Sequence, residues 1–274
     1  MKPQHSRRSF LRAAGMTAAA GTALGMRWNP LSQSNAPTSV LGYSQGGLPL
    51  VVHHYGNGGA PHRLFILGAH HGGPEANTAE LVRGLMAHLD ANPWEVPSNV
   101  ALDIMPEGNP DGLATDSRQF LSGVDPNRNW PGVGWQPDAY DSNGRYRPGL
   151  GGPEPLSEQE NRALADYLWW TRPLYVVNYH SQGGFMFGGG EGIQEELAWL
   201  YSSASGFRRP TAGGGGGRPG GGGILGYRVT GAMNGWLRGQ GIGSSLIELS
   251  TTWDPEFDRN LAGLRAVLGR LGQG

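Results

Sequence analysis

The sequence predicts an α/β fold in which helices cover both faces of a central sheet, and three observations support this prediction. Apolar runs of strand length recur along the chain, and amphipathic segments of helix length separate them. Runs such as residues 64–67 and 174–177 are continuously apolar, which is typical of strands buried on both faces. With 274 residues, the chain is long enough to bury a substantial core.

The expected elements follow one another with clear boundaries. Strands are expected at residues 40–43, 48–54, 63–69, 100–105, 174–180 and 245–250. Helices are expected at residues 76–92, 157–170, 193–203, 229–237 and 255–271. Ser157 and Asp254 are the expected N-caps of the second and the last of these helices.

Two segments carry no expected elements. Residues 106–155 are rich in Gly, Pro, Asn and Asp, and so long a segment inside a compact domain is usually functional. Residues 213–223 hold nine glycines, broken by Arg218 and Pro219, and we expect a mobile loop because glycine has a high backbone entropy.

Composition excludes several classes of function. The net charge is −1, from 21 basic and 22 acidic residues, so neither nucleic-acid binding nor a polybasic membrane patch is indicated. No run approaches the ~18 apolar residues of a membrane-spanning helix. Cysteine is absent, which excludes disulfides, thiol nucleophiles and thiolate metal ligands. Any metal must therefore be held by His, Asp or Glu.

The N-terminus has the order of an export signal. Ser6-Arg-Arg-Ser-Phe-Leu-Arg12 places paired arginines before an Ala/Gly-rich segment, which matches a twin-arginine signal peptide. Ser34-Asn-Ala36 is a small-x-small cleavage pattern. We therefore expect residues 1–36 to be a signal peptide and disordered leader read by the twin-arginine export machinery. Residues 37–274 are then expected to form the exported domain, which would be periplasmic or secreted.

Four polar residues lie at or near the ends of predicted strands. His71 and Glu75 follow one strand, His180 closes another, and Glu248 lies within a third. Two imidazoles and one carboxylate that leave a position for water make a catalytic zinc set, and a further carboxylate can move the protons. His70 is the alternative to His71, but neighbouring side chains on an extended chain point apart.

The long middle loop supplies cationic groups. Asn127 and Arg128 follow one another, and Arg118 precedes them. A guanidinium fork matches a carboxylate bidentately, so these residues can hold an anionic substrate group. Arg145 and Arg147 lie in the same loop and are alternatives to Arg118.

The order of these motifs resembles that of the zinc carboxypeptidases, the carboxypeptidase A-like metallopeptidases, in their bacterial forms. The resemblance extends from about residue 39 to the C-terminus. It implies a single domain with a mixed, mostly parallel twisted sheet. The motifs are the His-turn-Glu corner, Asn109-Pro-Asp-Gly, Gly123-Val-Asp-Pro-Asn-Arg-Asn-Trp, Tyr179-His-Ser, Tyr227-Arg-Val-Thr-Gly and Ile247-Glu-Leu.

The resemblance also implies a metal centre. Zn²⁺ would be held by His71, Glu75 and His180, with Glu248 as general base and acid. The usual corner is His-x-x-Glu, whereas three residues separate the two ligands here. Pro74 stands where a basic residue is common in the family, so the secondary substrate contact of that residue is not implied for this chain.

The remaining roles concern the substrate. The resemblance implies that Arg118 polarises the scissile carbonyl and that Asn127 and Arg128 bind the terminal carboxylate. Tyr227 would close over the substrate. The floor of the pocket for the terminal side chain should lie near Asn234, which is neither acidic nor basic.

The expected function is that of a metallocarboxypeptidase, which removes the C-terminal residue of a peptide. Two alternatives stay open. One is a zinc amidase or deacylase acting on murein peptides or acylated amino acids. The other is an inactive module that binds peptide C-termini, which is disfavoured because every expected ligand and the base are present.

Overall fold

The structure is a computed structural model that describes residues 36–132, 134–210 and 227–273. Nearly all of the predicted leader and the whole glycine tract at 213–223 lie outside the described residues. The described elements belong to one compact unit. None of the described helices is long and apolar enough to cross a membrane.

The main sheet has seven strands in the order β1-β2-β4-β3-β7-β9-β8. The four consecutive strands β4, β3, β7 and β9 run parallel, and β1, β2 and β8 each run antiparallel to their neighbours. The strands are β1 (Thr38–Tyr43), β2 (Pro49–Gly56), β3 (His62–Leu67), β4 (Val100–Met105), β7 (Tyr175–Ser181), β8 (Phe185–Gly189) and β9 (Gly243–Leu249). A small hairpin pairs β5 (Ala139–Tyr140) with β6 (Tyr146–Arg147).

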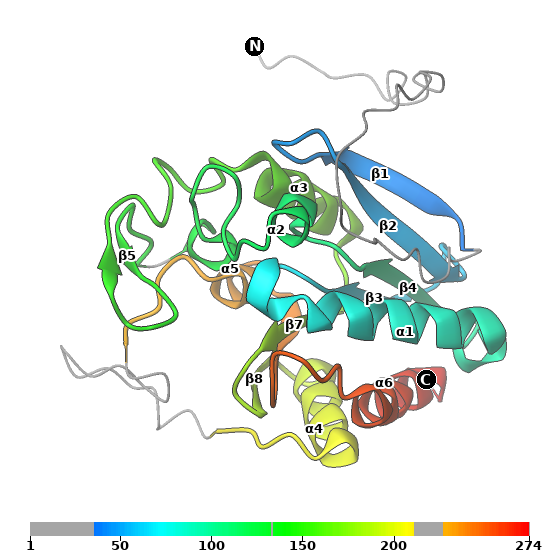
Figure 1. Cartoon of the computed structure of the whole chain (residues 1–274). Coiled ribbons are helices and arrows are strands. Elements are labelled where there is room, and N and C mark those ends of the chain that lie inside the picture. The colour runs from blue at the N-terminus through cyan, green and yellow to red at the C-terminus, as the bar shows by residue number, and fades with distance from the viewer. Residues whose placement is uncertain (1–35, 133, 211–226, 274) are drawn as a thin grey trace, which may run out of the picture. The chain divides into compact units, whose positions relative to one another are not determined.

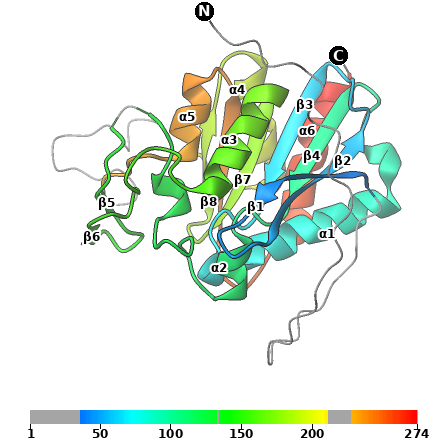
Figure 2. The same ribbon diagram turned by 90° about the horizontal axis from the view of Figure 1, so that it is seen from above.

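Helices cover both faces of this sheet, as predicted (Figures 1 and 2). One apolar core lies between the sheet and α1 (Asn77–Ala91), α4 (Ile193–Ser205) and α6 (Phe257–Gly272). The other lies between the sheet and α3 (Gln159–Thr171) and α5 (Met233–Gly239). In Figure 2, α3 and α5 lie in front of the strands and α6 lies behind them. The predicted fold class is therefore confirmed.

The alternation of side chains along β7 and β9 decides where the polar residues lie. Tyr179 of β7 and Ile247 of β9 pack into the core of α1, α4 and α6. The residues next to them, His180 and Glu248, therefore lie on the face that α3 and α5 cover. His180 and Glu248 are also directly paired in the parallel register of the two strands. Both lie near the carboxyl ends of the strands, where α/β sheets bind their ligands.

The predicted capping box at the start of α3 is wrong. The helix begins at Gln159, and no side chain caps it. The hydroxyl of Ser157 accepts a hydrogen bond from Asn129 instead, and Glu160 accepts one from the backbone N–H of Gln45. Tertiary partners therefore take the two side chains that a capping box would pair with the helix backbone.

Two other helix starts lie later than predicted. Asp254 accepts a hydrogen bond from the backbone N–H of Glu256, which forms a turn before α6 begins at Phe257. The helix expected at 229–237 begins at Met233.

Strand β8 was not predicted, because its short segment ends in glycines and resembles a loop in composition.

Candidate metal centre and active site

The corner after β3 is shaped by glycines. A Cβ on Gly72 would lie 2.2 Å from the carbonyl carbon of Gly112, so no larger residue fits without movement of the backbone. Gly73 adopts a φ of +49°, a left-handed conformation that glycine tolerates well. A short 3₁₀ turn, Gly73–Glu75, follows and leads directly to α1. This turn absorbs the extra residue between His71 and Glu75, so the unusual spacing still brings the two side chains together.

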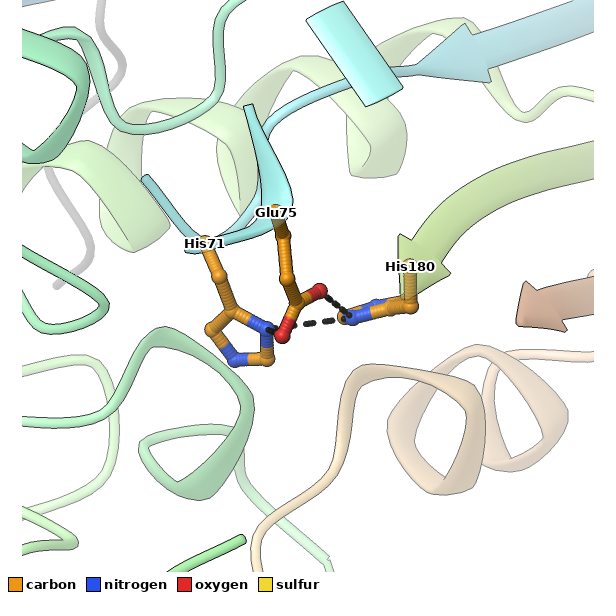
Figure 3. Close-up of side chains that lie close together, drawn as sticks. All are labelled: His71, Glu75 and His180. Carbon is orange, nitrogen blue, oxygen red and sulfur yellow. Dashed lines mark hydrogen bonds and ion pairs between the residues drawn. The ribbon is translucent and has the colours of Figure 1, made fainter. Parts of the chain in front are cut away.

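His71, Glu75 and His180 form one buried cluster in which each offers a ligand atom within 4.8 Å of the others (Figure 3). The Nδ1 atom of His71 lies 2.9 Å from Oε1 of Glu75. The Nδ1 atom of His180 lies 3.1 Å from Oε2 of Glu75 and 3.1 Å from Nδ1 of His71. The structure thus brings together the three residues that were expected to hold the metal.

The donor set fits a zinc ion. Nε2 of His71 lies 3.0 Å from Oδ1 of Asp125 and 3.1 Å from Nη2 of Arg118, while Nδ1 of the same ring faces Glu75 and is the ligand atom. Nε2 of His180 is buried without a hydrogen-bond partner among the described residues, while its Nδ1 faces the cluster. Two imidazoles and one carboxylate are a common protein ligand set of catalytic zinc.

Opposite charges keep the carboxylates of the centre ionised. Arg118 donates a hydrogen bond to Oε1 of Glu75, and its Nε donates to Oδ2 of Asp125 over 3.1 Å. Burial opposes the charge of Glu75, but His71 and Arg118 hold its pKa well below the usual value. Burial likewise opposes the charge of Asp125, and Arg118 and His71 hold its pKa well below the usual value. The centre therefore presents an anionic oxygen to a cation.

Asp125 was quoted within a motif but received no role in the sequence analysis. Its carboxylate lies beside His71, accepts from Arg118, and also accepts from the backbone N–H of Asn127 over 2.8 Å. It thus connects the metal corner to the loop that carries Asn127. The signal that could have revealed it is a lone carboxylate between Val124 and Pro126, an apolar setting for a charge.

Replacing Asp125 by asparagine should weaken zinc binding by about 10- to 100-fold, because partners of this kind orient the ligand imidazole and raise its basicity. Competition with a chromophoric chelator measures the dissociation constant. Asp138→Asn, just before β5, is the matched control, since Asp138 accepts hydrogen bonds from Tyr146 and the N–H of Gly149 on the surface. Equal zinc affinity in Asp125→Asn and wild type would contradict the assignment.

Glu248 is partly buried beside this centre. Burial raises its pKa, and the negative charge of Glu75 adds to the rise, to about 7. Burial lowers the pKa of His180 to about 4, so this imidazole is neutral and available as a ligand at neutral pH. A carboxyl group with a raised pKa near a metal centre is suited to accept and return a proton.

Asn127 and Arg128 lie together in a short 3₁₀ turn, Pro126–Arg128, and both are buried. Oδ1 of Asn127 accepts from the backbone N–H of Met233, which leaves its Nδ2 as the donor for a ligand. Nε and Nη1 of Arg128 donate to the carbonyl oxygens of Tyr140 and Asn127. The guanidinium carbon of Arg128 lies 6.0 Å from the ring centre of Tyr227. The expected substrate-binding residues are therefore neighbours.

The alternatives to Arg118 lie elsewhere. Arg145 and Arg147 are exposed in and beside the β5–β6 hairpin, and Arg147 pairs with Asp141. Of these three arginines, only Arg118 bonds to a ligand of the candidate centre within the described part of the chain. Asn234 has both carboxamide atoms buried without a hydrogen-bond partner among the described residues.

His70 is fully buried but lies outside the ligand cluster. Its Nε2 lies 3.3 Å from Oδ1 of Asn161, and its Nδ1 lies 3.5 Å from Nδ2 of Asn178. The expectation that His70 and His71 point apart is wrong, because the chain bends at Ala69, where φ is 39°, and the two rings stack. Burial lowers the pKa of His70 well below the usual value, so the ring is neutral.

Comparison with known proteins agrees with this geometry. Residues 33–190, more than half of the chain, match the zinc carboxypeptidase family model. No curated protein sequence matches significantly.

Several solved structures share the fold. The murein-tripeptide amidase MpaA from Escherichia coli O157 matches with a TM-score of 0.61 and 20% identity, over 86% of this chain and 91% of that one. Thrombin activatable fibrinolysis inhibitor matches with a TM-score of 0.72 and 18% identity, over 88% and 70%. Carboxypeptidase A from Helicoverpa armigera matches with a TM-score of 0.60 and 17% identity, over 88% and 68%. The chain belongs to the zinc carboxypeptidase family, whose metal is zinc.

Proposed function

We propose that this protein is a metallocarboxypeptidase that hydrolyses the bond before a terminal residue with a free carboxylate. The observation that carries the proposal is the position of the Asn127–Arg128 pair. Asp125, two residues before Asn127, binds the ligand His71, and Tyr227 lies beside Arg128. A substrate carboxylate held by this pair would present the preceding carbonyl to the metal centre, which gives cleavage one residue from the end.

The chemistry follows from the residues around the metal. Zinc bound by His71, Glu75 and His180 supplies Lewis acidity, which polarises a carbonyl and lowers the pKa of water. Glu248 takes the proton from the attacking water and then delivers it to the nitrogen of the leaving group. Arg118 donates hydrogen bonds toward the negative charge that develops on the carbonyl oxygen.

Replacing Arg128 by lysine should reduce kcat/KM for peptides with a free C-terminus by about 10- to 100-fold, because an ammonium cannot reproduce the bidentate guanidinium contact. Peptides of the same sequence with an amidated C-terminus should be cleaved slowly by both proteins and to the same extent. Steady-state kinetics on the two sets of peptides gives the comparison. Arg145→Lys, in the exposed hairpin, is the matched control.

An equal loss on free and amidated peptides would show that Arg128 does not hold the terminal carboxylate. Cleavage of amidated peptides by wild type at the rate of the free ones would overturn the exopeptidase proposal itself. The two outcomes are separate, since the first concerns one residue and the second concerns the reaction.

A second candidate is an amidase that acts on murein peptides with the same centre. The similar structure of a murein-tripeptide amidase, matched over 91% of its length, favours this candidate. The unpaired carboxamide of Asn234 also favours a polar terminal side chain, because a buried amide without partners is costly unless a ligand satisfies it. Turnover of γ-D-glutamyl-diaminopimelate peptides, ordinary dipeptides and N-acyl amino acids under one set of conditions separates the candidates.

We also propose that the protein is exported as a folded molecule by the twin-arginine machinery. The paired residues Arg7 and Arg8 precede an apolar stretch in the order of such signals. Replacing both by lysine should retain the protein in the cytoplasm, as cell fractionation and blotting would show. Lysine substitution at Arg27, outside the pair, is the control. Export of the doubly substituted protein at the normal level would contradict the proposal.

A further inference from the structure

His70 lies against both imidazole ligands of the candidate centre. Its ring stacks on that of His71 at 5.6 Å between centroids with an interplanar angle of 14°. It meets the ring of His180 edge-on at 5.7 Å and that of Trp130 edge-on at 6.0 Å. The side chain is 1% exposed and is absent from the group of residues that could hold the ion.

Two asparagines on different elements determine the orientation of this ring. Asn161 of α3 offers its Oδ1 to Nε2 of His70, and Asn178 of β7 offers its Nδ2 to Nδ1. An amide oxygen accepts and an amide NH₂ donates, so the ring carries its proton on Nε2. Both asparagines are buried within 1% exposure. Because a buried ring nitrogen without a partner is costly, these two contacts favour one orientation of the His70 ring.

The same two asparagines also connect His70 to the Pro126–Arg128 turn. Nδ2 of Asn161 donates to the carbonyl oxygen of Pro126 over 2.9 Å, at the start of the turn that carries Asn127. Nδ2 of Asn178 contacts Sδ of Met233 at 3.7 Å, and the N–H of Met233 donates to Asn127. These contacts therefore link His70 to the turn that carries Asn127 by two routes, one through Asn161 and one through Asn178 and Met233.

We propose that His70 is a positioning residue that fixes the orientation of both histidine ligands of zinc. It acts through the rings of His71 and His180 and touches neither substrate nor metal. The role depends on the zinc centre and not on which substrate is cleaved, so it can be tested on the resting protein. Asn161 and Asn178 contribute to this role, because their contacts hold the His70 ring against His71 and His180.

His70→Phe tests the role, because phenylalanine retains a ring of similar size and loses both hydrogen bonds. Zinc affinity, measured by competition with a chromophoric chelator, should fall by about 10- to 100-fold. The visible absorption spectrum of the Co²⁺-substituted protein should also change, since it reports the geometry of the ligands. His70→Gln, which retains one donor and one acceptor, should recover part of the affinity.

Tyr201→Phe is the matched control. The Tyr201 hydroxyl is buried on the opposite face of the sheet, where it bonds to Tyr179 and Asn260. This variant also loses buried hydrogen bonds, but we expect its zinc affinity and Co²⁺ spectrum to equal those of wild type. An equal loss in Tyr201→Phe would show a general effect of stability and would overturn the proposal.

Zinc affinity of His70→Phe within twofold of wild type, with an unchanged Co²⁺ spectrum, would also overturn it. If His70→Phe does not fold, Asn161→Ala and Asn178→Ala replace it in the same two measurements. Each should weaken zinc binding and shift the spectrum, and wild-type values in both would show that the ring needs no orienting partners.

Discussion

Replacing Glu248 by glutamine is expected to reduce kcat by about 100- to 10,000-fold, the usual contribution of a positioned general acid and base. Glutamine has nearly the same shape, but it can neither accept the proton of the attacking water nor return it. Glu248 is suited to both steps because burial and the charge of Glu75 raise its pKa to about 7. Steady-state kinetics on a peptide with a free C-terminus measures the loss.

The zinc content of Glu248→Gln should equal that of wild type, because Glu248 is not among the three grouped ligands. Elemental analysis of the purified variant separates a lost base from a lost metal. Glu80→Gln is the matched control, since Glu80 is exposed on α1 and has no place in the site. Near-normal turnover by Glu248→Gln on every peptide that wild type cleaves would refute the assigned mechanism.

Removal of zinc by a chelator should abolish turnover and lower the melting temperature while leaving the protein folded. Arg118 already pairs with Glu75 and Asp125, so the carboxylates do not become isolated charges when the metal leaves. The two apolar cores also hold the sheet without any help from the ligands. The lost stability follows mass action and is about 4 kcal/mol at a zinc concentration 1,000 times the dissociation constant.

Adding Zn²⁺ back should restore both activity and melting temperature, whereas Mg²⁺ should restore neither, because imidazole ligands suit zinc and not magnesium. Activity assays and thermal melts of the chelated and reconstituted protein measure both effects. Full activity of protein shown by elemental analysis to hold no metal would refute a zinc mechanism.

The parts of the fold that were predicted from sequence have strong local patterns. The strand at 100–105 lies where it was expected, and the final helix keeps its apolar stripe although it begins two residues later than expected, at Phe257. The errors occur where a tertiary contact replaces a local one, as at Ser157, whose hydroxyl bonds to Asn129 instead of the helix backbone. β8 was not predicted because its strand conformation depends on pairing with β9, and the local sequence pattern does not indicate this pairing.

In the candidate site, too, residue types and motif order could be predicted from the sequence, whereas tertiary contacts could not. His71, Glu75 and His180 were identified because their types and motif order are specific, although each alone is an ordinary residue. The partners of Asp125 and His70 could not be predicted from the sequence, because the orientation of a ring or the formation of an ion pair depends on elements distant in sequence. Asn161, for example, is 91 residues from His70 in the chain.

By itself, the sequence determined the class of fold, the order of its main strands along the chain and the residue types that suit a zinc hydrolase. Hydrophobic periodicity and motif spacing are local properties, so they can be read without the fold. Only the tertiary structure decided that β3, β7 and β9 are neighbours, which brings His180 and Glu248 beside His71. It also decided which ring nitrogen of His71 faces the metal position, because the buried carboxylate of Asp125 lies against the other one.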